Sequence, residues 1–146
     1  MFPNDRLNDL LIAVARCLLQ YVGESWPWTS DEEAAERAAV ERMVTEQRET
    51  VLHMAALLDD RAHRITYGQY PSEYTSLHYV ALDYLLDQLV DDQQRLADEL
   101  ASAALDAGGD AEAQRVISAA ADQAAGHQRA LQEQIAKRKF RSGVTA

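Results

Sequence analysis

The sequence is short of the residues that interrupt helices. Six glycines and three prolines are spread over its 146 residues, and both residue types destabilise the interior of a helix. Alanine, leucine, glutamate, glutamine and arginine, which favour helix, are frequent instead. Hydrophobic residues make up 47% of the chain, which at this length is enough to build one domain with a substantial core. We therefore expect an all-α protein with a single domain over residues 1–146.

Cysteine and long apolar runs are also scarce. Cys17 is the only cysteine, which excludes a disulfide within the chain, and its place on an apolar helical face predicts a small buried side chain. The first residues, MFPNDRLNDLL, lack the basic segment and the long apolar run of a secretory signal. No stretch is long enough to span a membrane. We expect a cytoplasmic protein that does not associate with membranes.

Positive charge is in the minority. Lysine and arginine number 14 against 24 aspartates and glutamates, so the formal net charge is −10. Proteins that bind nucleic acids normally present a basic face. The one basic cluster, Lys137-Arg138-Lys139 with Arg141, falls at the end of the last predicted helix, where the helix dipole favours cations. Nucleic acid is therefore not an expected partner.

Apolar residues recur every three or four positions in four segments, which predicts four amphipathic helices. We place these helices at about 5–23, 31–62, 74–106 and 111–140. Ser30 and Glu33 have the spacing of a capping box at the start of the second helix. Four such helices bury their apolar faces best in a four-helix bundle. The connection between the second and third helices can be either a hairpin or a crossover, and the sequence leaves both open.

Several polar residues interrupt the apolar faces. The stretch EQRETVLH places Glu46, Glu49 and His53 on one side of the second helix. Asp92 and His127 occupy apolar positions of the third and fourth helices, and with either connection Glu46, Glu49, Asp92 and His127 fall near the middle of the bundle. A buried carboxylate requires a partner, and carboxylate and imidazole are ligands of iron, manganese and zinc. The pattern predicts a metal site of these four residues, with His53 as a further candidate ligand.

This layout resembles the ferritin-like superfamily, whose four-helix bundles carry carboxylate-bridged di-metal sites. The resemblance implies Glu-x-x-His on the second and fourth helices and one glutamate on each of the other two. The corresponding positions here hold Glu46-Gln47-Arg48-Glu49 and Ala124-Ala125-Gly126-His127, with Asp92 on the third helix and Leu10 on the first. The stretch YPSEYTSLHY, residues 70–79, is also similar to the third-helix entry of uncharacterised bacterial ferritin-like proteins. The resemblance thus implies the fold together with a reduced metal site.

Each of these signals has a second interpretation. Glu46 and Glu49 can be solvated at the edge of the apolar face, with Glu49 paired to His53, and His127 can be a core histidine that Gln47, Gln93 or a tyrosine satisfies. The function is then that of a bundle without a cofactor, which acts through association as a homodimer or with an unknown protein partner. A small-molecule pocket among the connector tyrosines is a third alternative. The sequence shows no phosphate-binding glycine loop and no nucleophile with an evident base, so it gives no basis for assigning an enzymatic activity.

Overall fold

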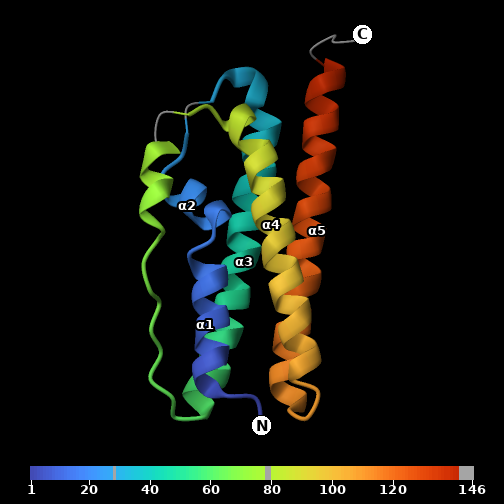
Figure 1. The fold of residues 1–146 in the computed structure, drawn as a ribbon. Helices are drawn as coiled ribbons and strands as arrows, with labels where there is room; N and C mark the ends of the chain where they lie inside the picture. Colours follow the sequence, from blue (N-terminus) through green and yellow to red (C-terminus); the bar gives the residue numbers. More distant parts are fainter. Residues whose placement is uncertain (28, 78–79, 142–146) are drawn as a thin grey trace.

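The computed structural model describes residues 1–27, 29–77 and 80–141, and in this part of the chain it is all-helical, without strands. The all-α prediction is therefore confirmed. The elements, drawn in Figure 1, are α1 (Asn4–Ala15), α2 (Leu18–Glu24), η1 (Asp31–Glu33), α3 (Ala34–Asp60), η2 (Ser72–Leu77), α4 (Leu82–Asp106) and α5 (Ala111–Arg141), where η marks a short 3₁₀ helix. His78 and Tyr79, the end of the YPSEYTSLHY stretch, lie outside the described residues. Among the helices described, none is both long and apolar enough to cross a membrane.

The connection between α3 and α4 is a crossover. In Figure 1, α1 and α2 run away from the end of the molecule that holds the N-terminus, α3 returns to that end, and the chain then runs back along the outside of α1 and α2 before α4 begins. Asn8 Nδ2 donates to the Thr66 carbonyl (2.8 Å), and further along α2 the rings of Tyr21 and Tyr70 lie 5.2 Å apart. Consequently α3 and α4 run parallel, and α5 runs antiparallel to both.

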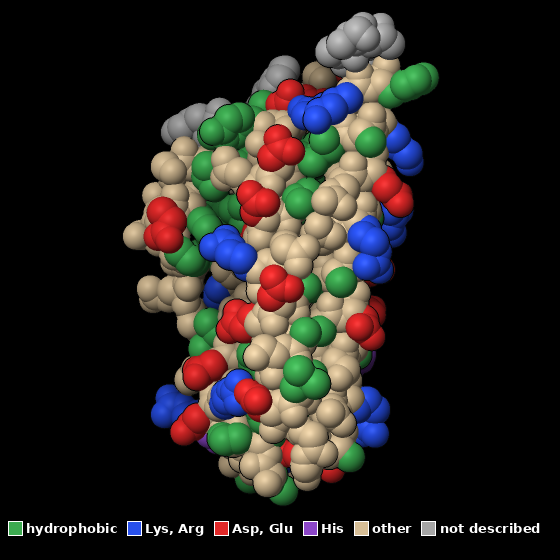
Figure 2. Space-filling view, turned by 45° about the vertical axis from the view of Figure 1, so that its right-hand side comes forward, with side chains coloured by type: hydrophobic (Ala, Val, Ile, Leu, Met, Phe, Trp, Pro, Cys, Tyr) green, Lys and Arg blue, Asp and Glu red, His purple; other side chains and the backbone are tan. Residues whose placement is uncertain are grey.

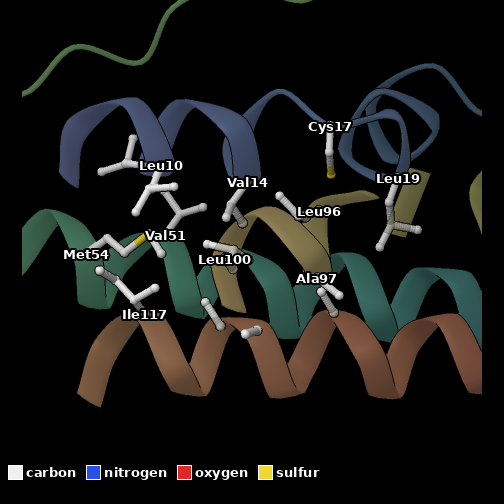
Figure 3. Close-up of a cluster of buried hydrophobic side chains, with 14 of the residues drawn as sticks. Leu10, Val14, Cys17, Leu19, Val51, Met54, Leu96, Ala97, Leu100 and Ile117 are labelled. Atoms are coloured by element: carbon white, nitrogen blue, oxygen red, sulfur yellow. The ribbon is translucent and has the colours of Figure 1, made fainter. Parts of the chain in front are cut away.

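The apolar faces of the helices meet in one core. Figure 3 shows side chains of α1, α2, α3, α4 and α5 directed toward one another, among them Leu10, Met54, Leu100 and Ile117. Small residues on α5, such as Ala113, Ala120 and Ala124, are almost fully buried. Small side chains bury little apolar area but allow close contact between helices. The periodicity of the sequence therefore identified the buried faces correctly.

Two helix boundaries differ from the prediction. The expected helix 5–23 is interrupted at Arg16 and Cys17, where Cys17 is extended (φ −74°, ψ 166°) although no glycine or proline is present. The interruption frees the N–H groups of Leu18 and Leu19, which hydrogen-bond to the buried Asp92 carboxylate from α4. The third helix begins at Leu82 instead of about residue 74, because the preceding residues form the separate helix η2. The capping box is confirmed, since Ser30 N donates to Glu33 Oε1 (3.0 Å).

Asp110 joins three segments at the end of the molecule where α4 turns into α5. Its carboxylate accepts hydrogen bonds from the Arg61 guanidinium (2.8 Å), from Phe2 N (3.1 Å) and from Ala113 N in the first turn of α5 (3.2 Å). The Asp110 side chain is only 6% exposed. Hydrogen bonding from Arg61, together with the two backbone donors, lowers the pKa of Asp110 to about 2. Asp110 therefore caps α5 and anchors both the N-terminus and the end of α3.

Acidic and basic side chains alternate over the face drawn in Figure 2. Within the basic cluster near the end of α5, Arg138 Nη1 lies 3.3 Å from the Asp83 carboxylate of α4. This arginine therefore contributes to the packing of α5 on α4.

Candidate functional site at Asp92

The five predicted metal ligands lie in different surroundings. Glu46 and His127 come together between α3 and α5, with 3.6 Å between Glu46 Oε1 and His127 Nε2. Glu49 and His53 are exposed, and His53 lines a surface hollow of about 390 Å³ between the same two helices. Asp92 is buried beside the junction of α1 and α2. Among the described residues, no three His, Cys, Asp or Glu side chains are grouped so that they could hold one metal ion. The five predicted ligands are therefore not gathered into one group in this part of the chain.

His127 is buried without a hydrogen-bond partner. Neither of its ring nitrogens reaches a partner within hydrogen-bonding distance among the described residues, so Gln47, Gln93 and the tyrosines do not satisfy it. Burial lowers the pKa of His127, and the neighbouring Glu46 carboxylate opposes this effect. The imidazole is thus neutral at neutral pH and carries a lone pair on one nitrogen.

Three buried glutamines form a hydrogen-bonded chain through the core. Gln20 of α2 donates to Gln47 of α3 (3.0 Å), and Gln47 donates to Gln93 of α4 (3.2 Å). The thiol of Cys17 donates to the same Gln47 oxygen (3.1 Å), and Figure 3 shows Cys17 pointing into the core. The amides therefore satisfy one another in a region that excludes water. We call Gln20, Gln47 and Gln93 the amide chain.

The amide chain ends at Asp92. Gln93 Nε2 donates to Asp92 Oδ2 (3.1 Å), and the N–H groups of Leu18 and Leu19 supply further hydrogen bonds. Burial raises the pKa of Asp92, while these hydrogen bonds and the Arg95 charge counteract the rise. Among the described residues, the nearest cation is Arg95 Nη2, which is 4.0 Å away on a side chain that is 79% exposed. In this part of the chain Asp92 is therefore a buried acid with hydrogen-bond donors but without an ion pair shorter than 4.0 Å.

Asp92 lines a hollow of about 230 Å³ between the α1–α2 junction, α4 and η2. Its wall is formed by Ala13, Arg16, Cys17, Tyr74, Asp92, Arg95, Leu96 and Glu99. Arg16 is held by the Tyr67 carbonyl (3.1 Å) and lies over the Tyr70 ring (4.8 Å), whereas Arg95 projects into solvent. A second hollow of about 580 Å³ shares Tyr74 and Arg95 with the first. We call the 230 Å³ space the Asp92 hollow.

Two titratable groups that line the Asp92 hollow keep their protons at neutral pH. Burial, followed by the Asp92 charge, raises the pKa of Cys17 to about 12, so the thiol is protonated and a poor nucleophile. Burial and the same charge raise the pKa of Tyr74 to about 12, and its hydroxyl stays protonated as well. The hollow thus presents the carboxyl groups of Asp92 and Glu99, the Tyr74 phenol and the guanidinium groups of Arg16 and Arg95, which are groups that bind polar ligands.

The sequence indicated only part of this site. The periodicity identifies Asp92 as a polar residue at an apolar position, but it predicts Cys17 only as a small buried side chain and Gln47 and Gln93 only as partners for His127. Gln47 and Gln93 fall on the apolar faces of their helices and are 1% and 0% exposed. Their recurrence at buried positions of neighbouring helices was the available signal. Tyr74 is one of the connector tyrosines for which the sequence allows a small-molecule pocket, whereas no pattern indicated Arg95. The crossover brings Tyr74 to the hollow that Arg95 also lines.

The chain matches no family model, no curated protein and no solved structure.

Proposed function

We propose that this chain is a four-helix bundle of the ferritin-like type that binds a small amine in the Asp92 hollow. The order of the helices supports the architecture, because a bundle with one long crossover is typical of ferritin-like proteins. In this reading α1 and α2 together form the first helix, and α3, α4 and α5 form the other three. The amide chain then lies in the interior where such bundles place their ligand sites.

The observation that carries the binding proposal is the environment of Asp92. A buried carboxylate is costly unless it is paired, yet Asp92 faces a hollow and has its nearest cation at 4.0 Å. A primary ammonium group has three N–H donors and one positive charge. Asp92, Glu99 and Tyr74 line the hollow and offer acceptors for such a group. The exposed Arg95 can move aside, since the other interactions that hold the site do not involve it.

Thermal unfolding of the full chain tests the proposal. Ethanolamine or putrescine should raise the Tm, because a ligand that binds only the folded protein stabilises it, by about 2.7 kcal/mol at a hundred times its Kd. Sodium acetate at the same ionic strength should not. Asp92→Asn, which keeps the shape and removes the charge, should abolish the shift, and Tyr74→Phe should reduce it.

The matched control is Asp87→Asn, on the same helix at an exposed position that lines neither hollow. Its amine response should equal that of the unmodified chain. An amine that gives no shift, or an equal shift in Asp92→Asn and Asp87→Asn, would exclude this binding site.

A second candidate function, metal binding, is favoured by the pair of Glu46 and His127. The imidazole is buried, lacks a hydrogen-bond partner and lies beside a carboxylate, a combination that zinc, manganese or iron can use. Two side chains do not fill the coordination sphere of such a metal, so water or a second copy of this chain would supply the other ligands. In the second case, metal binding would produce a homodimer.

Zinc and manganese chloride titrations test this second candidate. If it is correct, micromolar metal raises the Tm, His127→Gln and Glu46→Gln each remove the effect, and the exposed Glu49→Gln keeps it. Light scattering with and without zinc reports whether a second copy completes the site. Equal responses in all three variants would mean that the metal binds elsewhere on the acidic surface.

A further inference from the structure

The hydrogen bonds of the amide chain all point in the same direction. Arg48 Nε donates to Gln20 Oε1 (3.3 Å), and each glutamine donates its amide N–H to the next member, until Gln93 donates to Asp92 Oδ2 (3.1 Å). Arg48 is exposed on α3, while Asp92 lines the hollow next to the α1–α2 junction. A surface cation and a buried acid are therefore the two ends of one hydrogen-bonded line through the core.

The two ends determine this direction. A guanidinium group only donates hydrogen bonds, and a carboxylate only accepts them. If one amide turned over, its NH₂ group would face another donor and two carbonyl oxygens would face each other. Side contacts reinforce the same orientation, since Gln20 also donates to the Val44 carbonyl (3.0 Å) and Gln47 also accepts from the Cys17 thiol (3.1 Å). In the observed orientation each of the three side-chain amides accepts at least one hydrogen bond through its oxygen and donates at least one through its nitrogen.

We propose that Arg48 is a positioning residue for the Asp92 hollow and acts on Asp92 through the amide chain. Hydrogen bonds in such a line polarise one another, because each acceptor that receives a stronger bond becomes a better donor. The positive charge of Arg48 at the first amide strengthens the bond that Gln93 gives to Asp92. This inference concerns the site of the proposed function, but the coupling itself exists without any ligand.

Other groups act on Asp92 from different directions. The charged and titratable side chains that line its hollow, or that contribute to its electrostatic environment, are Arg16, Cys17, Tyr74, Arg95 and Glu99. Of these, only Cys17 also contacts the amide chain, and its thiol is protonated. A response of Asp92 to a change at Arg48 is therefore expected to pass through the amide chain and through the Cys17 thiol, which donates to Gln47 (3.1 Å) and accepts from Gln93 (3.7 Å).

The test follows the side-chain amide signals of the glutamines by ¹H–¹⁵N NMR, with the full chain and without ligand. In Arg48→Met the signal of Gln93, which Gln20 and Gln47 separate from Arg48, should move together with those of the other two. Arg48→Lys should preserve part of the effect through its remaining charge. Arg42→Met is the matched control: it removes the same charge from an exposed position of α3 that donates to no member of the chain, and it should leave the three signals in place.

Carbon-detected titration of the Asp92 carboxyl group gives an independent readout. Loss of Arg48 weakens the donor at Asp92, so the pKa of Asp92 should be higher in Arg48→Met than in Arg42→Met. Interruption of the line by Gln47→Met should remove any further effect of Arg48→Met. If Gln47→Met fails to fold, the comparison of Arg48→Met with Arg42→Met still shows whether Arg48 acts on Asp92. A response limited to Gln20 in Arg48→Met, with an unchanged Asp92 titration, overturns the inference.

The amine measurements separate this inference from the proposed function. If both hold, the ethanolamine affinities of Arg48→Met and Arg42→Met differ by about threefold or more. Propagated NMR shifts without amine binding would support the coupling and remove the function. If Arg48→Met and Arg42→Met bind the amine equally well and the NMR shifts do not propagate to Gln93, the proposed function is supported and the coupling through the amide chain is excluded.

Discussion

Replacement of Asp110 by alanine is expected to lower the free energy of unfolding by about 3–5 kcal/mol, the range for breaking a buried ion pair. The variant leaves the Arg61 guanidinium without its carboxylate, although that side chain is only 11% exposed. It also removes the cap at Ala113 N and the acceptor of Phe2 N. Urea denaturation at pH 7 measures the loss.

Asp106→Ala is the matched control for this result. Asp106 lies at the same end of α4 and pairs with Arg6 at 2.7 Å, but both side chains are about half exposed. Exposed pairs contribute little, roughly 0–1 kcal/mol. If both variants lost the same small amount of stability, Asp110 would not anchor this end of the protein.

The carboxylate of Asp110 also makes stability depend on pH. Its pKa is about 2 in the folded protein and 3.8 ordinarily, so the unfolded chain binds more protons between these values. The stabilisation is therefore complete above about pH 4 and is lost as the pH falls toward 2. Denaturation curves of the unmodified chain and of Asp110→Asn should differ strongly at pH 7 and converge near pH 2. A constant difference across this range would contradict the assigned pKa.

Replacement of Gln47 by methionine is expected to be the second most damaging change, at about 2–4 kcal/mol. The new side chain has a similar length and neither donates nor accepts a strong hydrogen bond. Gln20 loses an acceptor, Gln93 loses its donor and the Cys17 thiol loses its partner, and all of them are buried. Each orphaned buried group adds to the free-energy loss. Thermal and urea unfolding measure the effect.

The exposed Gln94→Met provides the comparison for Gln47→Met. Gln94 bonds only to the exposed Asp98 (3.0 Å), so its replacement should change stability by about 0.5 kcal/mol or less. A Gln47→Met variant as stable as Gln94→Met would mean that the core amides do not depend on one another.

The helices were predictable because their periodicity is local. Apolar residues at steps of three and four identified the buried faces, and the Ser30 and Glu33 pattern located the start of the second long helix. The interruption at Cys17 was not predictable, since no residue there disfavours helix. The N–H groups of Leu18 and Leu19 that the interruption frees bind Asp92, which lies on α4. The residues around Cys17 do not indicate a contact with a residue so far along the chain.

The candidate site was predictable at Asp92 and, as one alternative, among the connector tyrosines that include Tyr74. Periodicity assigns a residue to a face, but the rotation and height of the neighbouring helix decide what it contacts. Glu46 reaches His127 on α5, whereas Glu49, one turn further, is exposed. The Asp92 hollow also depends on the crossover, which brings Tyr74 to α4. A sequence pattern that allowed both a hairpin and a crossover could not place this tyrosine.

Binding of a small amine beside Asp92 can be followed by an NMR titration of the ¹⁵N-labelled full chain with ethanolamine. We expect saturable shifts of the backbone signals of Cys17, Tyr74 and Leu96, which line the hollow, and we expect these shifts to disappear in Asp92→Asn. Shifts that do not saturate, or that appear around Glu46 and His127 with the Asp92 hollow unaffected, would contradict it.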